Sequence, residues 1–540
     1  MRSYRLPFAA SIAFASAASY FVACGGDDAP AAPIVDASVD AADTSTQVDT
    51  GGPLPIPDAS VVHCTLDNGS DPVALCVQKL VLQAEHEAAF TDGGVAASWD
   101  SITGIVGAGP HDFHDDVAFG AALGHYIATS QEYGDTEIQK IVNGDLIALA
   151  GIVEKELATV PADYDGEIYE NLRAFQGGLN YLDEVAEAAK IGAIADAYVR
   201  GIYASYYHLV SETPIDAGAP DASAGSDAGD DAAITDAGAA SDADASSPSP
   251  FPDGILGELK NGHVDYDAQK AASGALALLD MVARQALTDT GIDAGDAAVV
   301  DSGAPRIDAV AWQRAARSIL DHLWNRARHP QLGLFYSKLE TSGDPAGDAL
   351  QTGVDHPDMI ETDTQGLLAV TFLRARALAV TYPAITAIDA SLFERRGEQI
   401  LTTLNGTPSF WDTTPLPTND AGSGFFEGYV PSTTTMVKTK PIRGNALLLA
   451  ALHRASLVSP PIHGSELSAM RSLFTSLYPH KTSFLTQALN QNSYLPRTSA
   501  DLDYPSDDAG NTASGTAYTS ASNHVACEAL TELWVGISGH

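Results

Sequence analysis

Residues 319–337 read ILDHLWNRARHPQLGLFYS, in which an apolar helical stripe runs into a loop of glycine and aromatic residues. The stripe belongs to a helix expected at 308–328, where apolar side chains recur every three or four residues. The loop carries Gly333-Leu334-Phe335-Tyr336, and a polar stretch then leads to a helix expected at 363–381. That helix opens with Asp363-Thr364-Gln365-Gly366. The pattern predicts a unit of helix, Gly-aromatic loop and helix.

The same unit occurs a second time further along the chain. A helix expected at 391–404 leads to a loop with Gly424-Phe425-Phe426-Glu427-Gly428-Tyr429. The next helix, expected at 441–456, opens with Ile442-Arg443-Gly444-Asn445. Two paired helices cannot bury their apolar faces alone, so repeated hairpins must stack or close into a ring. No run shows the sustained alternation of a β-strand, and we therefore predict an all-α fold.

Apolar periodicity and breaker residues predict about twelve helices. They are expected at 72–90, 113–131, 137–158, 165–188, 190–211, 267–288, 308–328, 363–381, 391–404, 441–456, 464–478 and 516–535. The units within 308–456 resemble the (α/α)6 toroids of six-hairpin glycosidases and of N-acylglucosamine 2-epimerase-like proteins. The resemblance implies an (α/α)6 toroid that acts on or binds carbohydrate. The alternative from another class is a non-catalytic helical protein with a structural or partner-binding role.

Three stretches are rich in aspartate and alanine and poor in large apolar side chains. Such a composition cannot bury enough surface to offset the entropy lost on ordering. We therefore expect a flexible tether at 24–61 and disordered insertions at 214–253 and 288–304. The helical domain is expected to span 62–540, interrupted by these insertions. The competing organisation is two helical domains, at 62–212 and 254–540.

The chain is strongly acidic, with 70 Asp and Glu residues against 28 Lys and Arg residues and a net charge of −42. Twenty of the acidic residues, and no basic residue, lie in the segments 27–60, 214–253 and 288–304. The remainder of the chain is still acidic, which argues against nucleic acid as a partner. A hydrophobic content of 45% is ample for a sizeable core.

The first 24 residues have the features of an export signal. Arg2 and Arg5 make a basic start, and residues 6–20 are apolar but too few to span a membrane. Phe21-Val22-Ala23-Cys24 resembles the lipobox of bacterial lipoproteins, where the peptide is cut before a lipid-modified cysteine. The resemblance implies a signal peptide at 1–23 and a lipid anchor on Cys24. It places the protein in the cell envelope, at the outer membrane or cell surface; an ordinary cleaved signal peptide is the alternative.

Two further cysteines, Cys64 and Cys76, flank the turn-like segment Asp67-Asn68-Gly69-Ser70. An exported chain meets oxidising conditions, so we predict a local disulfide between them. The alternative is that both stay reduced in the core, together with Cys527. No CxxC spacing occurs, which disfavours a metal site made of cysteines.

Acidic residues near helix openings are the candidate catalytic groups. In the toroids that the sequence resembles, the active cleft lies at one end, beside the loops that lead into the inner helices. Glu361, Asp363 and Glu427 are at such positions, and glycoside hydrolysis requires a pair of carboxylates. The competing interpretation of Glu361 and Asp363 is helix capping, because acidic residues at a helix start stabilise its dipole.

The candidate substrate-binding residues are Phe425, Phe426, Tyr429 and Arg443. Aromatic side chains offer flat apolar faces to sugar rings. The competing interpretation of the three aromatic residues is ordinary packing within the loop.

The segment Pro110-His111-Asp112-Phe113-His114-Asp115-Asp116 suggests a metal site as the least favoured function. HxxH is not the i, i+4 pair of a zinc helix, and His125 lies three helical turns, about 16 Å, beyond His114. Asp112 and Asp115 are better explained as an N-cap and an acidic first turn. We therefore expect no metal and no cofactor. The chain also lacks the GxSxG, GxxxxGK[ST] and HExxH motifs, which disfavours serine hydrolases, nucleotide enzymes and zinc proteases.

Overall fold

The structure is a computed structural model whose described residues make up nine helices and thirteen short strands. The described residues are 90–91, 94–95, 98–100, 113–130, 136–156, 163–210, 253–290, 306–342, 344, 347–354, 356–412, 424–438, 441–458, 464–468, 470 and 517–519. The helices are α3 (Phe113–Ser130), α4 (Thr136–Glu156), α5 (Gly166–Tyr181), α6 (Val185–Tyr206), α7 (Ala268–Thr290), α8 (Ala309–Arg326), α9 (Thr362–Thr381), α10 (Ala390–Leu404) and α11 (Ile442–Val458).

The strands are two to five residues long and pair only into small antiparallel sheets within the described residues. They are β1 (Phe90–Thr91), β2 (Gly94–Val95), β3 (Ser98–Asp100), β4 (Tyr207–Leu209), β5 (Gly254–Leu256), β6 (Glu258–Lys260), β7 (His263–Asp267), β8 (Lys338–Glu340), β9 (Ala349–Leu350), β10 (Ile360–Glu361), β11 (Gly428–Val430), β12 (Thr435–Val437) and β13 (Ala517–Thr519).

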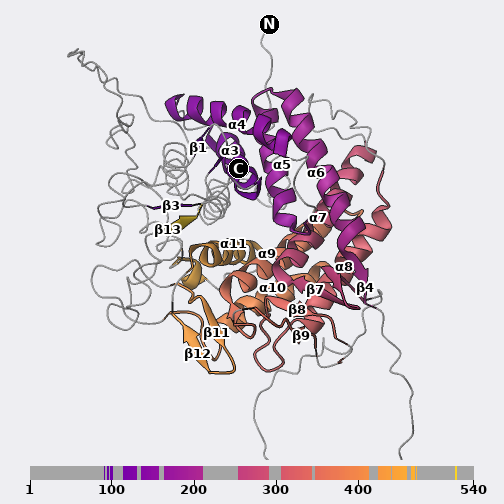
Figure 1. The fold of residues 1–540 in the computed structure, drawn as a ribbon, viewed down its shortest axis with the longest axis vertical. Coiled ribbons are helices and arrows are strands. Elements are labelled where there is room, and N and C mark those ends of the chain that lie inside the picture. Colours follow the sequence, from indigo (N-terminus) through magenta and orange to yellow (C-terminus); the bar gives the residue numbers. More distant parts are fainter. Residues whose placement is uncertain are drawn as a thin grey trace, which may run out of the picture.

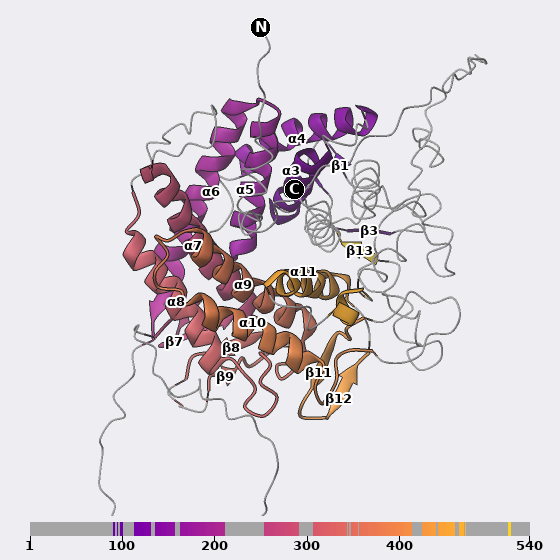
Figure 2. The ribbon, with the colours of Figure 1, turned by 180° about the vertical axis from the view of Figure 1, so that it is seen from behind.

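The helices form an inner and an outer layer. Along the inner layer, α3 packs on α5, α5 on α7, α7 on α9 and α9 on α11. Figure 1 shows these five helices following one another around the middle of the molecule, and Figure 2 shows the same order from behind. On the outside, α4 covers α3, α6 covers α5, α8 covers α7 and α10 covers α9. Each hairpin therefore contributes one inner and one outer helix, as predicted for an all-α toroid.

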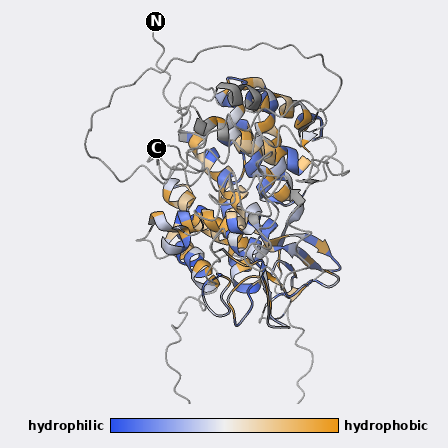
Figure 3. Cartoon of the chain, turned by 90° about the vertical axis from the view of Figure 1, so that its left-hand side faces the viewer, coloured by the Kyte–Doolittle hydropathy of each residue, from blue (hydrophilic) through white to orange (hydrophobic). Residues whose placement is uncertain are grey.

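Side-chain patterning decides the layer in which a helix lies. The inner helix α9 is buried on nearly all sides, from Leu367 and Leu368 to Phe372 and Leu373. The outer helix α10 buries one face, with Phe393, Ile400, Leu401 and Leu404 at helical spacing. Blue polar and orange apolar residues accordingly alternate along the helices in Figure 3. The buried side chains of all nine helices belong to one apolar core.

Two glycines bring the inner helices α3 and α5 into backbone contact. A Cβ atom on Gly178 would lie 2.6 Å from the Cα atom of Gly124. A Cβ atom on Gly124 would lie 2.4 Å from the carbonyl oxygen of Ala174. Only glycine fits at this crossing without moving one helix away from the other.

The predicted repeat appears as one hydrogen-bonding pattern made twice. The side-chain amide of Gln365 accepts from the backbone N–H of Phe335 at 2.9 Å and donates to its carbonyl at 2.8 Å. Asn445 makes the same pair with Phe425, at 2.8 and 3.0 Å. Each amide is the fourth residue of its inner helix. The Gly-aromatic loop is thus fixed to the helix that follows it.

A buried ion cluster joins α8 to α10. Asp321, which is 3% exposed, accepts from Arg317 Nε and from Arg396 Nη1, both at 2.6 Å. The Arg396 guanidinium also lies 5.0 Å from the ring centre of Trp324 and 5.8 Å from that of Phe372. One buried carboxylate therefore accepts hydrogen bonds from two guanidinium groups inside the apolar core.

His322 connects α8 to two loops. Its Nδ1 lies 2.7 Å from Asp253 Oδ1 and its Nε2 lies 2.8 Å from Asp348 Oδ2. Burial lowers the pKa of His322, but the hydrogen bonds to the two aspartates outweigh it and raise the pKa above its usual value. Asp253 directly precedes β5, which pairs with β4. The imidazole thus fixes Asp253 at the start of β5.

Several predicted bounds are wrong for local reasons. The helix expected at 165–188 ends at Tyr181, because Asp183 adopts a left-handed backbone with φ of 63°. The helix expected at 190–211 ends at Tyr206, where β4 pairs with β5 instead. Within the helix expected at 516–535, residues 517–519 form β13 and pair with β3. Strands this short contain too few residues to show alternation.

Other predictions reach beyond the described residues. Of the helix expected at 72–90 only Phe90 is described, and it lies in β1. Residues 464–468 and 470 are helical, and the rest of the helix expected at 464–478 lies outside the described residues. Asp253 and the last turn of α7, up to Thr290, are ordered margins of the two predicted insertions.

Candidate functional site

The amino-terminal residues of the inner helices meet at one end of the ring. Arg443, the second residue of α11, lies between the first turns of α5, α7 and α9. Its Nη2 donates to the two carboxylate oxygens of Glu167 at 2.9 and 2.7 Å. Its Nη1 donates to Gln269 Oε1 at 2.8 Å and to Asp363 Oδ2 at 3.4 Å. One side chain therefore joins four inner helices.

Arg443 stays cationic at this position. Its side chain is 21% exposed. Burial lowers the pKa of its guanidinium, but the neighbouring charges of Glu167 and Asp363 more than compensate and raise it. Asp363, at 28% exposed, is the more accessible of the two carboxylates beside Arg443, since Glu167 is 19% exposed.

A chain of hydrogen bonds leads from Arg443 to Glu361. Gln269 Nε2 donates to Thr364 Oγ1 at 3.0 Å. Thr364 Oγ1 lies 2.9 Å from Ser337 Oγ, and Ser337 Oγ donates to Glu361 Oε2. Glu361 and Asp363 are thereby held at the same end of the ring by one network.

The net effect of its surroundings is a pKa of the Glu361 carboxyl above its usual value. Burial raises the pKa of its carboxyl, and the negative charges of Asp363 and Asp267 raise it further. The hydrogen bond from Ser337 opposes these effects without cancelling them. Glu361 precedes α9 but makes no capping hydrogen bond with its side chain. Its carboxylate accepts a hydrogen bond from Ser337 and does not cap the helix.

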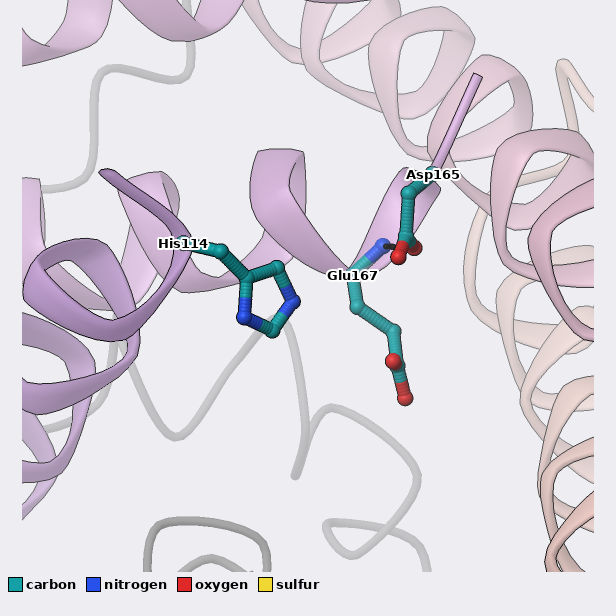
Figure 4. Close-up of side chains that lie close together, drawn as sticks. All are labelled: His114, Asp165 and Glu167. Carbon is teal, nitrogen blue, oxygen red and sulfur yellow. Dashed lines mark hydrogen bonds between the residues drawn. The ribbon is translucent and has the colours of Figure 1, made fainter. Parts of the chain in front are cut away.

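A second group of side chains lies where α3 approaches the start of α5. Figure 4 shows the His114 imidazole pointing from α3 toward Asp165 and Glu167. One ligand atom from each of the three lies within 4.8 Å of the others. Asp165 caps α5 by accepting from the Glu167 N–H at 2.9 Å, and it also accepts from Ser273 Oγ at 3.2 Å. Burial, and next the charge of Glu167, raise the pKa of Asp165 to about 6.

The sequence singles out only part of this site. Glu361, Asp363 and Arg443 were predicted, and the structure brings them together. Glu167 and Gln269 were not predicted, because they lie in other hairpins and belong to no motif. The sequence pairs His114 with His111, which lies outside the described residues, and with His125, but not with Asp165 or Glu167. Asp165 and Glu167, the residues beside His114, could have been found from the acidic sequence Asp165-Gly166-Glu167 at a predicted helix start.

The remaining predicted residues lie beside the network. The backbone oxygen of Glu427 accepts from the Thr362 N–H at 2.8 Å, which places Glu427 at the start of α9. Phe425 is fully buried, with its ring edge-on to Trp411 at 4.7 Å, and Phe426 is 8% exposed. Tyr429 is half-buried. Both phenylalanines are thus packed in the loop, while Cys24, Cys64 and Cys76 lie outside the described residues.

Comparison with known proteins finds similarity in fold only. No protein-family model matches the chain, and no curated protein matches it. A solved structure of a UGL variant with dGlcA-Glc-Rha-Glc has a TM-score of 0.50 at 11% identity, covering 86% of this chain and 97% of that one. The unsaturated glucuronyl hydrolase of Bacillus sp. GL1 has a TM-score of 0.49 at 12% identity, covering 86% and 96%. D-mannose isomerase has a TM-score of 0.48 at 10% identity, covering 85% and 96%.

At identities this low, the comparison describes the architecture and nothing finer. It agrees with the alternation of inner and outer helices along the described chain. The expected fold class is confirmed: the chain folds as an all-α (α/α)6 toroid.

Proposed function

We propose that the protein is a carbohydrate-active enzyme whose active site lies at the amino ends of α5, α7, α9 and α11. The observation that carries this proposal is the convergence of Glu361 and Asp363 at one end of the ring, within a network centred on Arg443. Two carboxylates with unlike environments are what glycoside hydrolysis needs. The likeness in fold to a protein solved with a bound saccharide supports the same conclusion.

In this proposal the two carboxyl groups have different roles. Glu361 donates a proton to the leaving oxygen of the glycosidic bond, because burial keeps its carboxyl protonated to higher pH than usual. Asp363 accepts a hydrogen bond from Arg443 and acts on the sugar or on an attacking water. Arg443 holds Asp363 and Glu167 in place by hydrogen bonds.

The Glu361→Gln variant tests the role of Glu361. On a glycoside that the wild-type protein cleaves, we expect kcat to fall by roughly 100- to 10,000-fold, because glutamine cannot donate the proton. The wild-type rate should fall as pH rises through the raised pKa of Glu361, since the acid form is then lost. This alkaline limb should be missing from the residual activity of the variant.

Glu258→Gln is the matched control, because Glu258 is 53% exposed on the hairpin of β6 and β7 and should leave kcat unchanged. Unaltered turnover in the Glu361→Gln variant would contradict the assignment. If the folded wild-type protein neither cleaves nor binds any member of a broad panel of neutral, amino and acidic oligosaccharides, the carbohydrate function itself fails. The non-catalytic alternative then takes its place.

We also propose that Cys24 carries a lipid anchor that holds the toroid at the cell envelope. Its support is the lipobox-like sequence at 21–24. None of the helices that the structure describes is long and apolar enough to cross a membrane. Because the proposed acyl chains are attached through the Cys24 thiol, Cys24→Ser should move the protein from the membrane fraction to the soluble fraction, or leave it unprocessed, whereas Cys527→Ser should not. Membrane-bound Cys24→Ser protein of normal mature size contradicts the anchor.

A further inference from the structure

The group of His114, Asp165 and Glu167 combines ligand types that divalent metal ions prefer. It supplies one imidazole nitrogen and two carboxylates, and the imidazole comes from a different helix than the acids. Among the described residues, it is the one group of three or more His, Cys, Asp or Glu side chains whose ligand atoms all lie within 4.8 Å of one another. Around a tetrahedral ion with bonds near 2.1 Å, ligand atoms lie roughly 3.4 Å apart. The ligand atoms lie within 4.8 Å of one another, so each pair would have to approach by at most about 1.4 Å to reach that geometry.

Negative charge exceeds positive charge at this end of the ring. Arg443 is shared by Glu167 and Asp363, and Lys270 pairs with Asp163 at 2.7 Å while lying near Asp165 and Asp267. Three cationic side chains, Arg443, Lys270 and Lys338, thus face the six carboxylates of Asp163, Asp165, Glu167, Asp267, Glu361 and Asp363. A divalent cation would complement this excess of negative charge where Asp165 is only 9% exposed.

We propose that His114, Asp165 and Glu167 bind a divalent transition-metal ion such as Zn²⁺ or Mn²⁺, linking the inner helices α3 and α5. The contact of Glu167 with Arg443 is compatible with this role. Arg443 reaches Glu167 through Nη2 alone, and each carboxylate oxygen has a second lone pair for the ion. Asp165 is fixed by its capping bond to the Glu167 N–H, so two ligands are already positioned on one helix.

Binding is measured by titrating ZnCl₂ and MnCl₂, and CaCl₂ for comparison, into the EDTA-treated full-length protein in a calorimeter. We expect one Zn²⁺ or Mn²⁺ per chain and weaker binding of Ca²⁺, which prefers six or more oxygen ligands. His114→Ala should weaken binding by at least about tenfold, because it removes a direct ligand. Binding needs no substrate, so this test is independent of the proposed enzymatic activity.

Two further variants keep the outcome decisive. His125→Ala removes the other described histidine of α3 and should leave the affinity within about twofold, since His125 is not part of the group. Asp165→Asn preserves the helix cap, because asparagine caps as well as aspartate, but it removes a charged ligand and should also weaken binding. Absence of binding by the wild-type protein, or equal affinity in His114→Ala and His125→Ala, overturns the proposal. If His114→Ala does not fold, Asp165→Asn decides instead: an affinity for Zn²⁺ and Mn²⁺ equal to that of the wild-type protein overturns the proposal.

Discussion

Asp321→Ala should lower the free energy of unfolding by about 3 to 5 kcal/mol, the cost of breaking a buried ion pair by removing one partner. Asp321 is the carboxylate that accepts hydrogen bonds from both Arg317 and Arg396 in the core. These arginines are 8% and 7% exposed, so without Asp321 both charges stay buried and poorly compensated. The loss is measured as a shift in the urea unfolding midpoint, followed by circular dichroism.

The matched control removes an acidic residue from an exposed ion pair. Glu258→Ala breaks the pair with Lys260, whose side chains are 53% and 54% exposed, and should cost less than about 1 kcal/mol. Comparable destabilisation by the two substitutions would contradict the importance of the buried cluster. A variant with Arg317→Met, Asp321→Leu and Arg396→Met should recover much of the stability, because apolar replacement of a whole buried ion cluster is often neutral.

Gly178→Ala should destabilise the fold by about 1 to 3 kcal/mol, the usual cost of overpacking. The added methyl group meets the Cα atom of Gly124 at 2.6 Å, and neither backbone can rotate away as a side chain could. The two inner helices must therefore separate. The change is read from the thermal midpoint of the purified variant.

Gly201→Ala provides a control with the opposite sign. Gly201 lies in α6, and a Cβ atom there has no neighbour within 4 Å. Alanine should stabilise the helix by up to about 1 kcal/mol, because it loses less backbone freedom on folding than glycine. A destabilising Gly201→Ala, or a neutral Gly178→Ala, would show that the backbone contact between α3 and α5 does not limit packing.

Local chemistry made the second half of the ring predictable from the sequence. The observed α8 and α10 begin one residue after Asp308 and Asp389, each of which accepts two backbone N–H groups as an N-cap. Apolar residues at helical spacing then recur along each of these helices. The Gly-aromatic loops were recognisable by their glycine and aromatic residues, and the structure adds the hydrogen bonds from Gln365 and Asn445 that hold them.

The composition of the site was only partly predictable, because it depends on closure of the ring. Arg443 and Glu167 are 276 residues apart, and nothing near either residue in the sequence indicates the other. Glu361 and Asp363 stood out because acidic residues at a helix start are conspicuous, yet helix capping explained them better. In the structure the side chain of Glu361 makes no capping hydrogen bond and accepts one from Ser337.

The pairing of Leu209 with Gly254 has a consequence for how this protein can evolve. The pairing and the bond of Asp253 to His322 hold together the two ends of the Asp-Ala-rich stretch between them. For the flexible insertion that its composition predicts, doubling the length costs only about 0.6 kcal/mol in closure entropy. We therefore expect that this junction tolerates a longer or shorter insertion, while the pairing of β4 with β5 stays the same.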